Sequence, residues 1–270
     1  MIYPIRGLEL KAISRFYDII KTVFGKNPVV LGNDLQTHDI FAAILIKFIF
    51  RNTIKRSNFC FRGKYNIQNR ALRFSFDINN EGDDVFIQNA EKLIKLLPEN
   101  AKLGLYECPY PYKRLLTPKI LRWCLSTGRF RFIKDTCCDS AVIKERLAIL
   151  NGSELKLFNA NCQTLLHSLR NGGSGYCGIM ANYHPSLYVW LCHNYENESE
   201  NAKLLQNFFT MSGFTEVGLP YPLTAKYHMC LEGIETELST RKPDGGILTD
   251  YAKDCIRQMR ALANHFKNTL

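Results

Sequence analysis

The pattern of apolar and polar residues is most regular between residues 103 and 137. Two short apolar runs, Leu103–Tyr106 and Phe130–Ile133, are each followed at once by a charged residue. Between them, Thr117–Leu125 has a helical pattern, with Pro118 at an early helix position and Thr117 as the expected N-cap. A strand, a helix and a strand in this order form a βαβ unit. We therefore expect two parallel strands joined by a right-handed crossover.

The same pattern predicts helices alternating with short strands along much of the chain. A length of 270 residues with 46% hydrophobic content suits one α/β barrel better than two unrelated domains. After residue 196 the pattern becomes purely helical. Helices are expected at Leu8–Phe24, Asp34–Phe50, Asp84–Leu97, Ser140–Leu150, Gln163–Leu169, Ser199–Ser212, Tyr221–Gly233 and Leu248–Phe266, and further strands at Pro28–Gly32, Leu155–Phe158 and Gly175–Ile179.

Lys134 closes the second apolar strand, which is an unusual position for a lysine. Its ammonium group is strongly hydrated and rarely fully buried. Burial lowers the pKa of a lysine and leaves a neutral amine that can attack a ketone to form a Schiff base. Tyr106 ends the neighbouring strand, so its hydroxyl could relay the protons that this reaction needs. The alternative interpretation is a lysine whose charged end reaches solvent.

Tyr106–Pro109, Ile133–Thr136 and Gly172–Asn182 form three motifs in a fixed order. They resemble the Y-N-x-P motif, the Schiff-base strand and the glycine-rich eighth strand of the dihydrodipicolinate synthase and N-acetylneuraminate lyase family. The 28-residue separation of Tyr106 and Lys134 also fits this family. The resemblance implies a (β/α)8 TIM-type barrel. It also implies a class I aldolase or lyase that acts on pyruvate or another 2-keto acid through Lys134, with Tyr106 as proton relay and without any cofactor.

The resemblance covers about residues 7–35 and 81–270, and it starts late in the family's pattern. Pro28–Gly32 resembles the third strand, so we expect a barrel that is incomplete at the N-terminus. Residues 1–196 would form the barrel portion without the first strands, and residues 197–270 a C-terminal three-helix extension. The missing second strand carries, in the family, a G-T-T-G-E loop that holds the pyruvate carboxylate. A second interpretation is therefore a catalytically impaired remnant of the family.

An incomplete barrel would expose two sheet edges. We expect the strand Gly175–Ile179 to lack its usual neighbour. The chain alone should then be poorly soluble or should associate through these edges, instead of forming the homotetramer that is common in the family.

The resemblance suggests substrate-binding roles at two further positions. Asn161 stands where the family has an aspartate facing the substrate, so it is either a substrate contact or a turn residue. Cys177 replaces an isoleucine of the eighth strand; the resemblance places it at the substrate, and we interpret it as a packing residue rather than a nucleophile. Dihydrodipicolinate synthases usually carry an arginine just after the Y-N-x-P motif, whereas here Pro111 takes that place and Arg114 follows three residues later. This favours a sugar acid or an uncharacterised aldehyde over aspartate semialdehyde.

Other catalytic classes find little support in the sequence. No histidine has a credible serine or cysteine partner in a motif, so we discard hydrolase mechanisms. His184, directly before Pro185, is interpreted as a loop residue rather than a catalytic base.

The net charge of +10 comes mostly from one segment between Phe41 and Phe76. Basic residues interleaved with aromatic ones can bind single-stranded nucleic acid. The alternative is a divergent insertion or a frame-disturbed coding region, which we favour because the basic residues follow no helical or strand period. We therefore predict no nucleic-acid partner. The segment contains eight basic residues and no acid: Lys47, Arg51, Lys55, Arg56, Arg62, Lys64, Arg70 and Arg73.

The ten cysteines are scattered, with no C-x-x-C pair and no spacing typical of a zinc site. We expect reduced, mostly buried thiols in a cytoplasmic protein, and no metal site. No apolar run approaches the length of a membrane span, and charged residues interrupt any signal-peptide core near Met1. A small-molecule 2-keto acid is the only partner that the sequence predicts besides further copies of the chain.

Overall fold

The computed structural model describes residues 29–30, 76–77, 79–95, 99, 102–109, 113–240 and 245–270. The helices expected at Leu8–Phe24 and Asp34–Phe50 lie outside these residues. The elements are β1 (Val29–Val30), α3 (Asp83–Ile94), β2 (Leu103–Tyr106), α4 (Pro118–Thr127), β3 (Phe130–Asp135), α5 (Ser140–Leu150), β4 (Lys156–Asn159), α6 (Leu165–Arg170), β5 (Gly175–Tyr176), the 3-10 helix η1 (Ile179–Asn182), α7 (Pro185–Asn194), α8 (Ser199–Gly218), α9 (Leu223–Leu231) and α10 (Asp250–Thr269).

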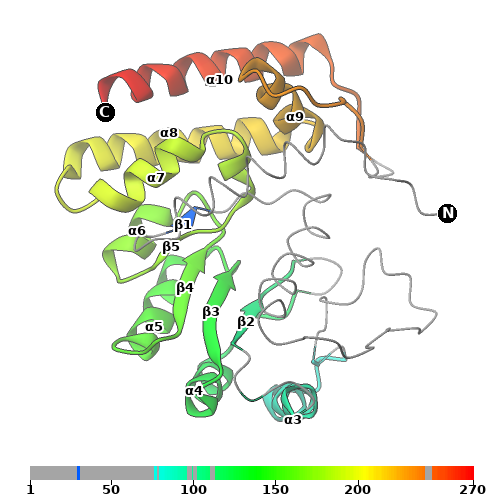
Figure 1. Cartoon of the computed structure of the whole chain (residues 1–270), viewed down its shortest axis with the longest axis vertical. Coiled ribbons are helices and arrows are strands. Elements are labelled where there is room, and N and C mark those ends of the chain that lie inside the picture. Colours follow the sequence, from blue (N-terminus) through cyan, green and yellow to red (C-terminus); the bar gives the residue numbers. More distant parts are fainter. Residues whose placement is uncertain are drawn as a thin grey trace.

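Five parallel strands form one sheet in the order β1-β5-β4-β3-β2. From β2 to β5, each strand pairs with the next one along the chain, and a helix connects them (Figure 1). Parallel neighbours need such crossovers, because a tight turn cannot return the chain to the same end of the sheet. The expected α/β architecture with a parallel sheet is therefore confirmed for the described residues.

Local sequence signals fix the ends of the helices beside β3. The Thr117 hydroxyl accepts a hydrogen bond from the Ile120 amide at 3.3 Å, and Pro118 occupies the first turn of α4. Gly128 ends α4 with a φ of 62°, a conformation that favours glycine. The Asp139 carboxylate caps α5 by accepting bonds from two backbone amides of its first turn. Thr117 and Pro118 therefore begin α4 as the sequence predicted.

The strand expected at Gly175–Ile179 differs from the prediction in two ways. Its second neighbour is present, because Val29 pairs with Gly175 and Val30 with Tyr176. β1 lies in the segment interpreted as the family's third strand, so this edge is covered by a different strand from the usual neighbour. The strand is also only two residues long, and η1 begins at Ile179. A Cβ atom on Gly178 would lie 2.2 Å from the Tyr176 hydroxyl. The backbone at Gly178 therefore approaches the Tyr176 side chain more closely than a residue with a Cβ atom could.

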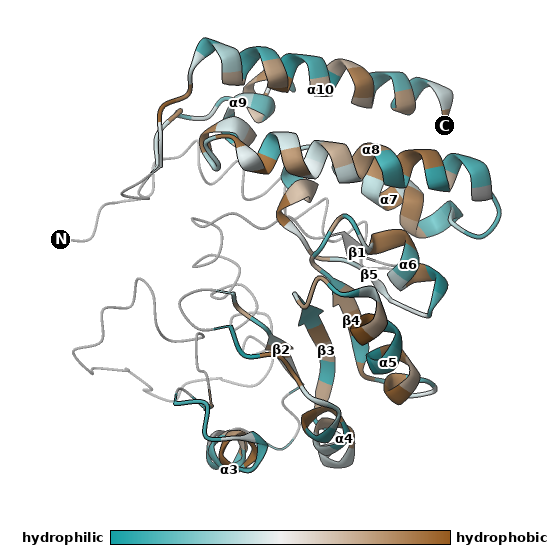
Figure 2. Ribbon diagram, turned by 180° about the vertical axis from the view of Figure 1, so that it is seen from behind, coloured by the Kyte–Doolittle hydropathy of each residue, from teal (hydrophilic) through white to brown (hydrophobic). Residues whose placement is uncertain are grey.

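Two apolar clusters fill the described part of the molecule. One joins the sheet around Ile133 and Leu157 to the inner faces of α3, α4 and α5. The other joins α6, β5 and α7 to α8, α9 and α10, around Tyr176 and Phe209. Figure 2 shows apolar and polar residues alternating along α8 and α10, as expected for helices with one buried face. The helices that follow residue 196 therefore share a core with the sheet.

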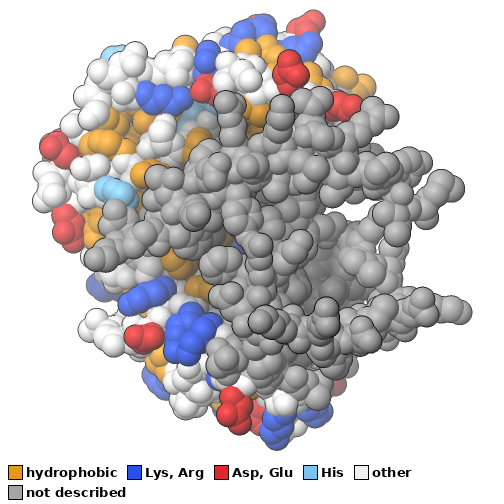
Figure 3. All heavy atoms as spheres, viewed as in Figure 1, with side chains coloured by type: hydrophobic (Ala, Val, Ile, Leu, Met, Phe, Trp, Pro, Cys, Tyr) orange, Lys and Arg blue, Asp and Glu red, His pale blue; other side chains and the backbone are white. Residues whose placement is uncertain are grey.

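The described surface carries no concentrated charge of one sign in the view of Figure 3, where basic, acidic and apolar side chains are interspersed. The eight basic residues between positions 47 and 73 lie outside the described residues, so the absence of a nucleic-acid partner stays a prediction. None of the helices in the described ranges combines the length and the apolar character that crossing a membrane requires.

Candidate functional site

Lys134 and Tyr106 lie side by side at the carboxyl ends of β3 and β2. The two residues are partners in the strand register, as the sequence predicted. The Lys134 ammonium nitrogen lies 4.2 Å from the centroid of the Tyr106 ring. Only 7% of Lys134 is exposed, so its side chain does not extend into solvent. The interpretation of Lys134 as a solvent-reaching strand-end lysine is therefore wrong.

The surroundings of Lys134 change its acidity. Burial lowers the pKa of Lys134, since the neutral amine needs less hydration than the ammonium. Cys177 and Cys108 oppose this effect, and the face of the Tyr106 ring also favours a cation. Burial is the larger influence, so Lys134 carries a larger fraction of neutral amine at a given pH than an exposed lysine does.

A buried network of charges holds the two strand ends that carry Lys134 and Tyr106. Arg146 of α5 donates to both carboxylate oxygens of Glu107, at 2.7 and 3.1 Å, and also to the carboxylate of Asp135. Glu107 directly follows Tyr106, and Asp135 directly follows Lys134. The carboxylates raise the pKa of Arg146, although burial alone would lower it. Arg146 therefore stays charged between two acids.

The same network also fixes backbone groups around the site. Glu107 accepts hydrogen bonds from the Leu116 amide at 2.6 Å and the Thr136 amide at 2.9 Å. The Thr136 hydroxyl donates to the Glu107 carbonyl at 2.6 Å. Bonds of this kind hold the strand ends in one position, which is what a preorganised site requires.

Sequence reasoning did not identify Arg146 as part of the site. One signal was present, because Arg146 lies on the apolar face of α5 together with Ile143, Leu147 and Leu150. An arginine on a buried face is rare unless it is paired. Glu107 and Asp135, the acids at two adjacent strand ends, are its charged partners here.

Cys177 follows β5 and lies close enough to Lys134 for the charges of the two groups to influence each other. Burial raises the pKa of the Cys177 thiol, and Lys134 partly opposes this shift. The Cys177 amide donates to the Asn159 carbonyl at 2.8 Å. The structure thus places Cys177 near Lys134, at the carboxyl ends of the strands. The role of Cys177 in substrate binding stays a prediction.

Asn161 lies in the turn before α6. Its side-chain oxygen accepts a hydrogen bond from the Thr164 amide at 2.9 Å, and its side-chain nitrogen donates to Gln163 at 2.7 Å. Its own amide donates to the side chain of Asn159 at 2.7 Å. Asn161 therefore serves as a turn residue here, and a contact with substrate stays a prediction.

Arg114 does not lie free beside the site. Its guanidinium forms ion pairs with Asp83 at 2.6 Å and with Asp77 at 3.3 Å. These contacts connect the segment before α4 to the start of α3, which agrees with the sequence-based view that Arg114 does not replace the arginine of dihydrodipicolinate synthases.

No protein-family model matches the sequence, and a comparison with curated proteins finds no match either. Solved structures do match the fold. The 4-hydroxy-tetrahydrodipicolinate synthase from Methylacidiphilum fumariolicum SolV has a TM-score of 0.60 at 15% identity, over 71% of this chain and 63% of that one. Dihydrodipicolinate synthase from Thermotoga maritima has a TM-score of 0.59 at 17% identity, over 69% and 63%.

A prophage protein of the dihydrodipicolinic acid synthase family from E. coli K12, solved in complex with pyruvate, matches with a TM-score of 0.57 at 18% identity. It covers 69% of this chain and 62% of that one. The chain thus spans less than two thirds of the length of these structures. At such low identity the matches establish the fold alone. The described part of the chain has a parallel α/β fold similar to part of the structures of the dihydrodipicolinate synthase and N-acetylneuraminate lyase family.

Proposed function

We propose that the protein is a Schiff-base aldolase or lyase that acts on pyruvate or another 2-keto acid through Lys134. The observation that carries this proposal is the position of Lys134, buried at a strand end with a lowered pKa and directly beside Tyr106. Similar folds in known lyases, one of them solved with pyruvate, support the same reaction class. In this proposal the strands close into a barrel like that of the family.

In the proposed reaction the neutral amine of Lys134 attacks the ketone carbon of the substrate. A carbon–nitrogen bond forms, and the carbonyl oxygen leaves as water after it has accepted protons. Tyr106 lies beside the amine and would relay these protons, directly or through one water molecule. The protonated imine then withdraws electrons from the adjacent carbon, which allows a carbon–carbon bond to form or break there.

The remaining side chains would hold the reacting groups in place. The Glu107–Arg146–Asp135 network keeps both strand ends fixed, so the amine and the phenol need little reorganisation. Cys177 would line the substrate position beside Lys134. Asn161 would add a hydrogen bond to the substrate only if its turn rearranged, because its polar atoms are engaged locally.

The first test is chemical trapping of the imine. Incubation with pyruvate and borohydride should attach one reduced pyruvate to the chain, and peptide mass spectrometry should locate it on Lys134. A Lys134→Ala variant should lose the adduct. Lys156 offers a matched control, because it is an exposed lysine at the opposite end of the neighbouring strand β4. A Lys156→Ala variant should be labelled like the unmodified protein.

Two outcomes contradict the proposal in different ways. Equal labelling of the Lys134→Ala variant would show that the modification is unspecific. A cooperatively folded protein that forms no adduct at all would favour the alternative interpretation, a remnant of the family that lacks the loop for the pyruvate carboxylate.

A further inference from the structure

A second group of buried polar side chains lies among the C-terminal helices, away from the residues assigned to the imine reaction. His184 lies directly before α7, Glu216 is in α8 and His228 is in α9. All three residues are at most 1% exposed. Their potential ligand atoms lie within 4.8 Å of one another. The sequence predicts a loop position for His184 and no metal site, because the three residues follow no ligand spacing typical of zinc.

We propose that His184, Glu216 and His228 bind a divalent transition-metal ion of the zinc type. The proposal does not depend on the imine chemistry at Lys134. Two imidazole nitrogens and one carboxylate form a donor set that zinc commonly accepts, with a fourth position left for water or another small ligand. Calcium and magnesium prefer six or more oxygen ligands, so this donor set disfavours them.

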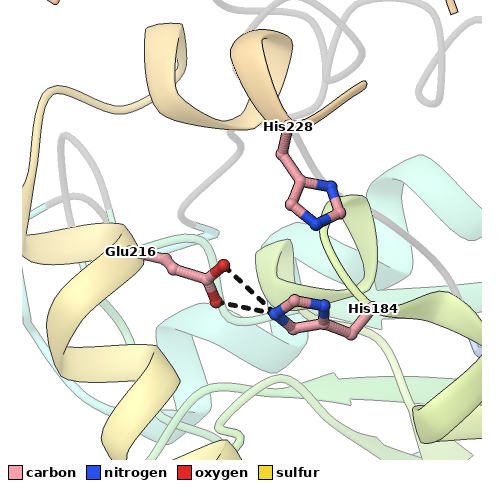
Figure 4. Close-up of side chains that lie close together, drawn as sticks. All are labelled: His184, Glu216 and His228. Carbon is pink, nitrogen blue, oxygen red and sulfur yellow. Dashed lines mark hydrogen bonds and ion pairs between the residues drawn. The ribbon is translucent and has the colours of Figure 1, made fainter. Parts of the chain in front are cut away.

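The strongest independent observation is the unsatisfied nitrogen of His228. Its Nε2 atom is buried and has no hydrogen-bond partner among the described residues. Figure 4 shows a ring nitrogen of His228 turned toward His184, while His184 faces the Glu216 carboxylate. Leaving a buried polar atom without a partner costs about 1–3 kcal/mol. A metal ion in this position would accept the lone pair of Nε2 and remove that cost.

The distances suit an ion after a small adjustment. His184 Nε2 lies 3.0 and 3.1 Å from the two carboxylate oxygens of Glu216. Ligand atoms around a tetrahedral zinc ion are about 3.3 Å apart, given zinc–ligand distances of about 2.0–2.1 Å. The His184–Glu216 pair therefore needs to open by a few tenths of an ångström, and His228 needs to approach it. The ion would replace the proton that His184 and Glu216 share.

Metal binding requires this group to release one proton, because a carboxyl group coordinates a metal ion in its deprotonated form. Burial lowers the pKa of His184 and of His228 to about 3, so both rings are neutral, as metal ligands are. Burial raises the pKa of Glu216 to about 8, and a hydrogen bond from Ser212 opposes this shift. His184 and Glu216 therefore form a hydrogen bond between neutral groups rather than an ion pair.

The surroundings would hold such a site rigid and dry. The Tyr183 hydroxyl donates to the Glu216 backbone carbonyl at 3.0 Å. The Phe208 ring lies 5.3 Å from the His184 ring, between centroids, and Tyr183 lies 5.6 Å from His228. Because the three ligands come from three different elements, a bound ion would connect α8 and α9 to the start of α7.

The test uses the whole purified chain, treated with a chelator and then desalted. Calorimetric titration should detect one equivalent of bound Zn²⁺, and the unfolding temperature should rise by several degrees when zinc is added. Substitution of Co²⁺ should give an absorption spectrum typical of nitrogen and oxygen ligands, without thiolate charge-transfer bands. This readout distinguishes the proposed site from zinc bound by the cysteines.

Two variants and one control locate the site. His228→Leu removes the unsatisfied nitrogen and fills the site with an apolar side chain of similar size, so the metal-free protein should keep most of its stability, while zinc affinity should fall at least about tenfold. Glu216→Gln keeps a hydrogen bond to His184 but should weaken zinc binding as well. His193→Ala changes an exposed histidine of α7 and should leave binding unaltered. Absence of zinc binding in the unmodified protein would overturn the proposal. Zinc affinity in both variants equal to that of the unmodified protein would also overturn it.

Discussion

Two groups of buried ionisable residues in the described part of the chain differ in how burial affects their charge. The network of Glu107, Arg146 and Asp135 keeps its charges, and its side chains are at most 2% exposed. The group of His184, Glu216 and His228 is equally buried but adopts neutral forms, since the pKa of His184 falls to about 3 and that of Glu216 rises to about 8. The comparison shows that burial alone does not determine charge.

The difference comes from the cation that each group contains. A guanidinium does not lose its proton in proteins, and its planar donors match two carboxylates at once. An imidazole loses its proton easily, so burial neutralises it when no strong partner compensates. Every charge of the first group is therefore paired within the group, although Arg146 Nε has no hydrogen-bond partner among the described residues. The second keeps unsatisfied nitrogens on His184 and His228, which is why we propose that it binds an ion.

Removal of Arg146 should have the largest effect on stability. Arg146→Met leaves Glu107 and Asp135 buried without a countercharge, and breaking such a group costs about 3–5 kcal/mol in the free energy of unfolding. Arg131→Met is the control, because Arg131 pairs at 3.4 Å with the exposed Glu154 and should cost about 1 kcal/mol or less. Urea denaturation of both variants measures the difference. Equal losses would show that the network is not a buried charge pair.

The same substitution in the two groups gives a sharper comparison. Glu107→Gln removes one charge beside a permanent cation, and we expect a loss of about 3 kcal/mol or more in stability. Glu216→Gln replaces a neutral carboxylic acid by a neutral amide, so the loss should be about 1 kcal/mol. Urea unfolding of metal-free protein, in the presence of a chelator, tests this. A larger loss for Glu216→Gln would mean that Glu216 is ionised in the folded protein.

The smallest effect on stability is expected at Lys134, because a buried amine that serves catalysis does not stabilise the fold. Lys134→Met replaces a buried amine by an apolar chain of similar length. Its stability should be unchanged or should rise by about 1 kcal/mol, as often happens when a functional polar residue is replaced. Thermal unfolding of this variant and of the unmodified protein provides the measurement. A loss of several kcal/mol would instead assign Lys134 a structural role.

The region from residue 103 to 170 could be predicted closely from the sequence. Its strand ends, its helix caps at Thr117 and Asp139, and the pairing of Tyr106 with Lys134 all follow from local patterns. These features depend on neighbours in the chain, on side-chain hydrogen bonds to nearby amides and on the requirement that a βαβ unit has parallel strands. The proposed catalytic pair was visible for the same reason.

The other decisive features became visible only in the tertiary structure. The pairing of β1 with β5 joins segments about 145 residues apart, and no local pattern specifies which strand occupies a free sheet edge. His184 and Glu216 are 32 residues apart and His228 lies on a third element, so their meeting depends on how the helices pack. The sequence by itself determined the local elements and the lysine–tyrosine pair. The packing decided which polar groups share a buried environment, because burial and proximity are properties of the whole fold.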